Sequence, residues 1–310
     1  MTKVFIDGKA GTTGLRIYER LSQREDIEII TLSEEERKLP EARKRALNAC
    51  DIAFLCLPDD AAREAVSMIE NENVVVLDTS TAHRTDPSWC YGFPELSAAY
   101  EDKLLNSKRI AVPGCHASGF IALVYPLIEA GAIKPDILLC CHSLTGYSGG
   151  GKKMIAEYEA DEKAMELDAP RQYGISQQHK HLKEMKAIAG IDKAPCFSPI
   201  VSDFYSGMLV TVPLFAEQLN EGFDIEAIKK IYAEKYTGEV VRYCESIDNG
   251  GFVAANGVDG ADSMFVSVSG NDERIVLMAL YDNLGKGASG AAVQCMNMVM
   301  GIDKTTGLVL

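Results

Sequence analysis

The feature that most constrains this chain is the alternation of short apolar segments with helical stretches over its first 130 residues. The apolar segments that we expect to be buried strands are residues 4–7, 27–30, 51–57, 74–77 and 109–112. Strands that alternate with helices in this way build a parallel sheet with helices on both of its faces. The sequence therefore predicts an α/β fold with a doubly wound, Rossmann-like parallel sheet.

A glycine-rich loop directly follows the first predicted strand and precedes an amphipathic helix. Its residues are Gly8, Lys9, Ala10, Gly11, Thr12, Thr13 and Gly14. A strand, a glycine loop and a helix in this order build a phosphate cradle at the helix N-terminus. The glycine spacing differs from the usual dinucleotide fingerprint, so an ordinary tight turn is the alternative. In this context the loop predicts a cofactor site made by all seven residues.

The tip of the second predicted strand indicates which nicotinamide cofactor binds. An NAD enzyme usually places an acidic residue there to hold the ribose hydroxyls, whereas this chain has Ser33. A hydroxyl with Arg37 and Lys38 nearby suits a 2′-phosphate, which favours NADP. Against this, the segment 34–36 is acidic, and Arg37 and Lys38 could belong to a solvated helix face.

The segment 112–119 predicts a nucleophile at its centre. Cys115 lies between a short strand and a helical run, at a turn where free amides and the helix dipole stabilise a thiolate. The flanking Gly114 and Gly119 allow the backbone or a substrate to approach closely. The alternative is a buried, inert cysteine. The turn and the nucleotide loop upstream favour a catalytic Cys115.

The pattern changes in the second half of the chain. Predicted strands follow one another with few helices between them, at 137–144, 197–204, 207–214, 239–243, 262–269 and 274–281. Such runs predict a second α+β domain on a mostly antiparallel sheet. We expect three parts, an NADP-binding domain over 1–115, a substrate and catalytic domain over 116–283, and a C-terminal helix over 284–310 that returns to the first domain.

Two further segments are candidates for binding an anionic substrate. One is the loop with Ser148, Gly149, Gly150, Gly151 and Lys152, which precedes a helix predicted over 154–167. Glycine amides and a lysine at this place suit a phosphate or a carboxylate, although a flexible linker is the alternative. The other candidate is Arg84, which follows the fourth strand, near the crevice where ligands of parallel sheets bind.

Bulk properties exclude several classes of partner. The net charge of −14 argues against binding of nucleic acids or anionic membranes, and no apolar run approaches membrane-spanning length. The nine cysteines are odd in number and mostly lie in apolar runs, which indicates free thiols and a cytoplasmic protein. No pair has zinc-ligand spacing, so no metal is expected. A broad antiparallel sheet favours a homo-oligomer, a dimer or a tetramer.

Taken together, these motifs resemble the N-acetyl-gamma-glutamyl-phosphate reductases, and their short form in particular. The matching segments are 8–14, 91–96, 113–115, 148–152, 179–184 and 282–290, spread in the family's order over nearly the whole chain. The segments 91–96 and 282–290 are the most specific. His116 after the cysteine and Arg84 within 81–84 depart from the longer form and fit the short one.

The resemblance implies a phosphorylating, NADP-dependent reductase that acts in arginine biosynthesis. Cys115 attacks the acyl phosphate of N-acetyl-glutamyl 5-phosphate, and the resulting thioester is reduced to N-acetyl-glutamate 5-semialdehyde. A histidine serves as general acid/base, and we expect His181 rather than His179, with Glu184 one helical turn later to orient it. Asn283 is expected to contact the cofactor.

Three alternatives stay open on the sequence. An aspartate-semialdehyde dehydrogenase or a glyceraldehyde-phosphate enzyme would share the nucleotide loop and the catalytic cysteine. The segments 91–96 and 282–290 argue against both. A non-catalytic NADP-binding redox sensor would use Cys115 as an oxidisable switch, but needs neither the histidine pair nor the glycine-lysine loop. A cysteine hydrolase would have no use for the nucleotide loop.

Overall fold

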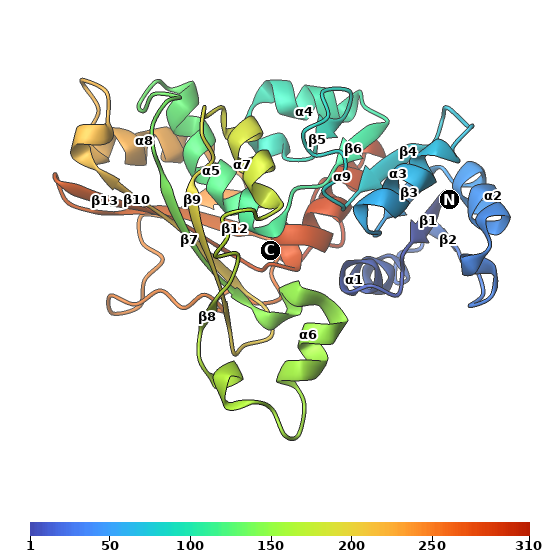
Figure 1. The fold of residues 1–310 in the computed structure, drawn as a ribbon. Helices are drawn as coiled ribbons and strands as arrows, with labels where there is room; N and C mark the ends of the chain where they lie inside the picture. The colour runs from blue at the N-terminus through green and yellow to red at the C-terminus, as the bar shows by residue number, and fades with distance from the viewer. The chain divides into compact units, whose positions relative to one another are not determined.

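The computed structural model describes all of residues 1–310. The chain forms two compact units, which are described in turn (Figure 1). Unit 1 comprises Met1–Pro113 and Ala288–Leu308, and unit 2 comprises Gly114–Gly287 with Val309–Leu310. No helix combines the length and the apolar character that are needed to cross a membrane.

Unit 1 is built on a six-stranded parallel sheet, with the strand order β2-β1-β3-β4-β6-β5. The strands are β1 (Thr2–Asp7), β2 (Ile27–Ile30), β3 (Ile52–Leu55), β4 (Val75–Asp78), β5 (Cys90–Tyr91) and β6 (Arg109–Ala111). The helices are α1 (Thr12–Leu21), α2 (Pro40–Ala49), α3 (Asp59–Ser67), α4 (Ala98–Leu105) and α9 (Gly290–Val299). The predicted doubly wound parallel sheet is confirmed.

Both faces of this sheet are buried, and β1 shows why its strands are continuously apolar. Val4 and Ile6 pack into one hydrophobic cluster with Ile17 of α1 and several residues of α9. Phe5, which points to the opposite face, packs into a second cluster with Leu47 of α2. Each face of a parallel sheet needs its own cover of helices, and α9 supplies part of one cover from the far end of the chain.

Unit 2 is built on a seven-stranded mixed sheet, with the strand order β11-β12-β13-β10-β7-β9-β8. The strands are β7 (Cys140–Gly146), β8 (Arg171–Gln172), β9 (Cys196–Ser202), β10 (Met208–Phe215), β11 (Val241–Tyr243), β12 (Met264–Gly270) and β13 (Arg274–Tyr281). The pairs β11–β12 and β7–β9 are parallel and the other pairs are antiparallel. The expected mostly antiparallel sheet is confirmed.

The helices of unit 2 are α5 (Cys115–Glu129), α6 (Gly151–Tyr158), α7 (His181–Ala189) and α8 (Ile225–Lys235). Helix α5 is apolar on nearly all sides because it packs against β10, β13, α7 and α8 at once. Its Gly119 is required by this packing, since a Cβ atom there would lie 2.7 Å from both the Tyr281 hydroxyl and a Val210 methyl group.

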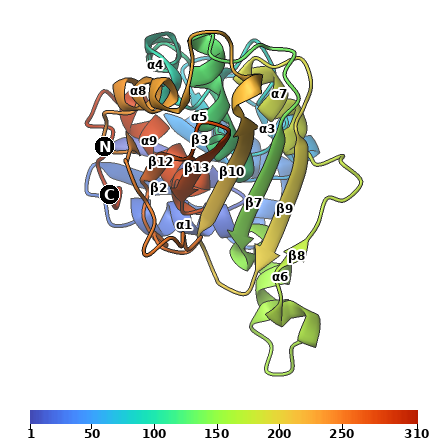
Figure 2. The same cartoon turned by 90° about the vertical axis from the view of Figure 1, so that its left-hand side faces the viewer.

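Helix α6 corrects a boundary that the sequence predicted. The helix expected over 154–167 ends at Tyr158, and a separate 3-10 turn follows at Met165–Asp168. The buried ring of Tyr158 stacks on Tyr147 at 4.6 Å, which turns the chain back instead of letting the helix continue. Figure 2 shows α6 projecting beyond the ends of β8 and β9.

Candidate active site

The glycine loop of unit 1 adopts a conformation that larger residues could not share. Gly8 has φ +88°, and a Cβ atom there would lie 2.2 Å from the carbonyl oxygen of Cys56. At Gly14 a Cβ atom would lie 2.5 Å from the carbonyl oxygen of Gly8. The loop therefore closes tightly against β3, and α1 begins within it at Thr12. Free amides at this helix N-terminus fit the phosphates of a nucleotide cofactor.

A cavity of about 630 Å³ extends from the glycine loop along the carboxyl end of β2. Its lining includes Gly8, Lys9 and Ala10 of the loop, Thr31 and Leu32 after β2, and the charged residues Asp7, Glu34, Arg37, Lys38 and Arg43. The ammonium group of Lys9 lies over the ring of Tyr18, 3.1 Å from its centroid. This cavity has the size and the position for part of a dinucleotide.

The structure places Ser33 beside this cavity, outside its lining. The Ser33 amide donates to the Glu36 carboxylate at 3.0 Å, and the Glu36 amide donates to the Ser33 hydroxyl at 3.2 Å. These hydrogen bonds hold the pKa of Glu36 below its usual value. Arg37, in contrast, lines the cavity and forms an ion pair with Glu34.

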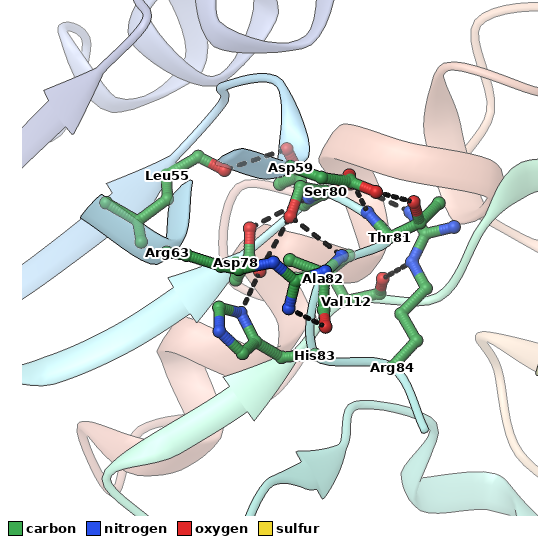
Figure 3. A network of polar contacts seen from close by, with 11 residues as sticks. Leu55, Asp59, Arg63, Asp78, Ser80, Thr81, Ala82, His83, Arg84 and Val112 are labelled. Carbon is green, nitrogen blue, oxygen red and sulfur yellow. Dashed lines mark hydrogen bonds and ion pairs between the residues drawn. The ribbon is translucent and has the colours of Figure 1, made fainter. Parts of the chain in front are cut away.

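A buried polar network lies at the carboxyl end of β4 (Figure 3). Asp78, fully buried, accepts hydrogen bonds from the amide and the hydroxyl of Ser80, and its carboxylate lies 2.6 Å from Nδ1 of His83. The His83 ring stacks on Trp89 at 4.1 Å. Sequence analysis singled out Arg84 after this strand but missed the Asp78–His83 pair. The network fixes the loop between β4 and β5.

Arg84 extends from this fixed loop. Its Nε donates to the carbonyl of Val112 at 2.9 Å and its Nη2 donates to the carbonyl of Thr79 at 2.8 Å (Figure 3). The same loop is tied down by Asp59, which accepts from the amide and the hydroxyl of Thr81. The guanidinium is thus positioned at the carboxyl ends of β4 and β6, and its fork geometry suits a phosphate or a carboxylate.

In unit 2, Cys115 is the first residue of α5 and is partly exposed. The turn around it is held by Tyr281, whose hydroxyl donates to the Cys115 carbonyl at 2.5 Å and accepts from the Gly119 amide at 3.0 Å. A Cβ atom at Gly287 would lie 3.1 Å from the Cys115 Cβ atom, so a glycine keeps this side open. The helix N-terminus favours a thiolate here.

Three of the other cysteines lie in surroundings that disfavour a thiolate. Burial raises the pKa of Cys50 to about 12, that of Cys56 to about 12 and that of Cys90 to about 11. These thiols stay protonated at neutral pH and have the properties of small core residues. Position at a helix N-terminus therefore separates Cys115 from them.

Glu184 of α7 contacts the backbone beside the cysteine. Its carboxylate accepts a hydrogen bond of 2.8 Å from the amide of Gly114, the residue before Cys115. Glu184 is buried, so this contact joins α7 firmly to the start of α5. The sequence suggested Glu184 as a partner for His181 but missed Gly114, which lies 70 residues away along the chain.

Three histidines cluster next to this turn. The ring centroids of His179 and His181 lie 5.7 and 5.6 Å from that of His116 and 4.8 Å from each other. The two nitrogens of His116 lie 2.7 Å from the Ser143 hydroxyl and 2.6 Å from the Tyr173 hydroxyl. Burial lowers the pKa of His116 to about 3 and that of His179 to about 4. Ser143 and Tyr173 were missed because no local pattern connects them to His116.

The structure brings Asn283 together with part of the glycine-lysine loop. The Asn283 amide nitrogen donates to the Ser148 hydroxyl at 3.0 Å, and its oxygen accepts from the Gly207 amide at 2.9 Å. Gly149 lies nearby, since a Cβ atom there would be 3.5 Å from the Asn283 amide nitrogen. Gly150 continues this loop, whereas Lys152 is exposed on α6.

Comparisons with known proteins show the family to which this chain belongs. The family model described as "Semialdehyde dehydrogenase, NAD binding domain" matches residues 3–103, and the one described as "Semialdehyde dehydrogenase, dimerisation domain" matches residues 115–283. A protein of Trichormus variabilis named N-acetyl-gamma-glutamyl-phosphate reductase is 42% identical over 318 residues, with 99% of each chain covered. One of Rhizobium meliloti with the same name is 43% identical over 305 residues, covering 96% of this chain and 98% of its own.

Solved structures share the fold at lower identity. Aspartate semialdehyde dehydrogenase II of Vibrio cholerae, complexed with ASA, has a TM-score of 0.70 at 15% identity, covering 97% of this chain and 98% of its own. The aspartate semialdehyde dehydrogenase of Francisella tularensis has a TM-score of 0.71 at 13% identity, covering 97% and 100%. These two likenesses show the fold, whereas the relatives above 40% identity decide the group within it. The chain belongs to the semialdehyde dehydrogenases and, among them, to the N-acetyl-gamma-glutamyl-phosphate reductase family.

Proposed function

We propose that this enzyme reduces N-acetyl-glutamyl 5-phosphate to N-acetyl-glutamate 5-semialdehyde and phosphate, as a step of arginine biosynthesis. The observation that carries the proposal is the geometry of Cys115. Its thiol stands at the N-terminus of a buried helix, in a turn held by Tyr281 and Glu184. A fixed, partly exposed cysteine of this kind suits covalent catalysis on an acyl group.

In the first step, the Cys115 thiolate attacks the carbonyl carbon of the acyl phosphate. The carbon–sulfur bond forms, the bond to the phosphate oxygen breaks, and inorganic phosphate leaves. A bound nicotinamide cofactor supplies the hydride that reduces the resulting thioester. The oxyanion then reforms a carbonyl as the carbon–sulfur bond breaks, which releases the aldehyde and restores the thiolate. The covalent bond holds the carbonyl in place throughout this sequence.

We assign the general acid/base role to His181. Both ring nitrogens of His116 are engaged by Ser143 and Tyr173, and Nδ1 of His179 lies 3.2 Å from the His181 amide. His181 is buried at the start of α7, one helical turn before Glu184. In the proposed cycle it stabilises the thiolate, gives a proton to the oxygen as the alkoxide develops and takes that proton back as the aldehyde forms, while His179 contributes to the shape of the site.

The substrate is an anion in a chain of net charge −14, so it needs local positive charge and amide donors. We assign this task to the guanidinium of Arg84 and to Lys152. The hydroxyl of Ser148 and the amides of Gly149 and Gly150 complete the proposed substrate site. Support for Arg84 comes from its fixed guanidinium, and support for Ser148 comes from its hydrogen bond to Asn283.

For the cofactor we propose NADP. The glycine loop from Gly8 to Gly14 would hold its diphosphate, and Asn283 would contact its nicotinamide half. Ser33 would receive its 2′-phosphate, with Arg37 and Lys38 at the adjoining cavity as the cations. The tight closure of Gly8 and Gly14 supports this placement, because a dinucleotide needs close backbone approach.

We also propose a cytoplasmic homodimer. The matched "dimerisation domain" description and a sheet face with exposed Cys140, His142, Cys196 and Phe215 support pairing through unit 2. The free state of the nine cysteines supports a reducing compartment. Sedimentation equilibrium would test the dimer, and a monomer at micromolar concentration would contradict it.

A reverse assay tests the activity most directly. N-acetyl-glutamate 5-semialdehyde, phosphate and NADP should yield NADPH, and omission of phosphate should stop the reaction. Aspartate semialdehyde, run in parallel, should react much more slowly. Preferred use of aspartate semialdehyde would overturn the substrate assignment, and the absence of any turnover would favour a redox sensor.

A further inference from the structure

Two of the residues that line the unit 1 cavity form an ion pair. Glu34 and Arg37 both line the cavity after the end of β2, and their side chains are bonded to each other. Both are well exposed, with 78% of the Glu34 side chain and 42% of the Arg37 side chain accessible. An exposed pair of this kind contributes little to stability, so a stronger anion can replace the carboxylate at small cost.

The other two acidic residues of the segment 34–36 do not line the cavity. Glu36 is held in reciprocal hydrogen bonds with Ser33 and does not line the cavity. Glu35 does not line it either. Glu34 is therefore the carboxylate of the acidic segment that a cofactor in this cavity would meet.

Arg43, a second arginine of the cavity, forms ion pairs with Asp7 and Glu64. Its Nε and Nη2 donate to Asp7 at 3.1 and 2.9 Å, and its Nη1 lies 3.4 Å from Glu64. Only 13% of its side chain is accessible, so this pair is well enclosed. Arg37 is the more exposed guanidinium, and its partner is Glu34.

We propose that Glu34 sets the cofactor selectivity of this enzyme by competing with the 2′-phosphate of NADP for Arg37. The inference rests on the proposed placement of the cofactor in this cavity. When a 2′-phosphate enters, Arg37 leaves the carboxylate for the dianion, while Glu34 repels that dianion. When NAD enters, the carboxylate can accept a hydrogen bond from the ribose 2′-hydroxyl. Arg37 and Lys38 favour binding of NADP over NAD, and Glu34 reduces this preference.

The test compares Glu34→Gln with Glu35→Gln in the full chain. Both substitutions remove one negative charge from neighbouring exposed positions, but only Glu34 lines the cavity. Dissociation constants for NADP⁺ and NAD⁺ are measured by isothermal titration calorimetry, without substrate. Glu34→Gln should tighten NADP⁺ binding about three- to thirtyfold and leave NAD⁺ binding equal or weaker, as expected for loss of one like-charge contact. Glu35→Gln should change both constants by less than about twofold.

A double-mutant cycle tests whether Glu34 acts through Arg37. Arg37→Gln should weaken NADP⁺ binding, and in that background Glu34→Gln should recover less than its gain in the parent. Equal effects of Glu34→Gln and Glu35→Gln would show a general charge effect and overturn the proposal, as would an unchanged NADP⁺ constant in Glu34→Gln. If the parent binds both cofactors equally, the proposed NADP preference is wrong, but the shift caused by Glu34→Gln still decides the role of Glu34.

Discussion

The carboxylate of Glu184 accepts a hydrogen bond of 2.8 Å from the amide of Gly114, and so a helix in the middle of the chain fixes the residue before the nucleophile. Glu184 lies one helical turn after His181, on the same helix. The proposed acid/base and the backbone of the nucleophile therefore share one rigid support. This arrangement can keep the distance between imidazole and thiol constant during turnover.

Glu184→Ala should lower turnover by about ten- to a hundredfold, because a misplaced nucleophile loses its alignment. The unsatisfied Gly114 amide should also cost about 1–3 kcal/mol of unfolding free energy. Glu184→Gln keeps an acceptor for the amide but loses the charge. Steady-state kinetics and urea unfolding measure both effects, with exposed Glu217→Gln as the control.

The comparison of Gln with Ala separates two roles of Glu184. If Glu184→Gln keeps the turnover of the parent while Glu184→Ala loses it, the residue acts by holding Gly114. If Glu184→Gln is stable but as slow as Glu184→Ala, the charge itself is needed, in keeping with orientation of His181. Full turnover in both variants would contradict any role of Glu184 in the site.

Tyr281→Phe should destabilise the enzyme by about 1–3 kcal/mol, since it removes the hydroxyl that serves both Cys115 and Gly119 in a buried place. Tyr243→Phe is the matched control, because its hydroxyl bonds to exposed Glu245. Urea denaturation of both variants measures the difference. An equal, small loss in both would show that the Tyr281 hydroxyl contributes nothing to the turn.

Stability should fall as the pH is lowered below about 6.5, partly because of His116. Burial lowers its pKa in the folded state from 6.5 to about 3, so between these values the unfolded chain binds a proton that the native state refuses. Above the unfolded pKa, protonation of this group costs the fold no stability. Below it, each unit of falling pH lowers the free energy of unfolding by at most about 1.4 kcal/mol. The unfolding free energy of the His116→Gln variant, measured by urea titration at pH 7, 6 and 5, should depend less steeply on pH than that of the parent. Parallel curves for parent and variant would contradict this assignment.

Lys152→Ala should raise the KM of the acyl phosphate about five- to fiftyfold and leave that of NADPH unchanged, if the ammonium group helps to bind the substrate. Lys153→Ala is the control on the same helix, since Lys153 is exposed and lies 4.0 Å from Glu157. A change confined to the KM of NADPH would place the loop at the cofactor instead.

Much of the fold was predictable from local patterns. The strands of unit 1 are apolar because both sheet faces are covered, and Gly8 and Gly14 mark a turn that excludes a Cβ atom. Cys115 was recognisable because its signal, a turn between strand and helix, is local as well.

The contacts that complete the site were not predictable in this way. Glu184 meets Gly114, and Tyr173 meets His116, across long stretches of sequence, and no periodicity encodes such pairs. The Asp78–His83 pair lies within five residues, yet its importance follows only from full burial and the stacked Trp89. The end of α6 at Tyr158 likewise depends on a stacked neighbour, not on a local stop signal.

Covalent catalysis by Cys115 requires an acyl-enzyme, which intact-protein mass spectrometry after rapid quenching can detect. The enzyme is mixed with N-acetyl-glutamyl 5-phosphate in the absence of cofactor. We predict a mass increase of one N-acetyl-glutamyl group, located on the peptide with Cys115, together with release of phosphate. Cys115→Ser should show no adduct and lose about three or more orders of magnitude in turnover, because a hydroxyl is barely ionised at neutral pH. An unmodified Cys115 in the parent, with near-normal turnover in Cys115→Ser, would contradict the mechanism.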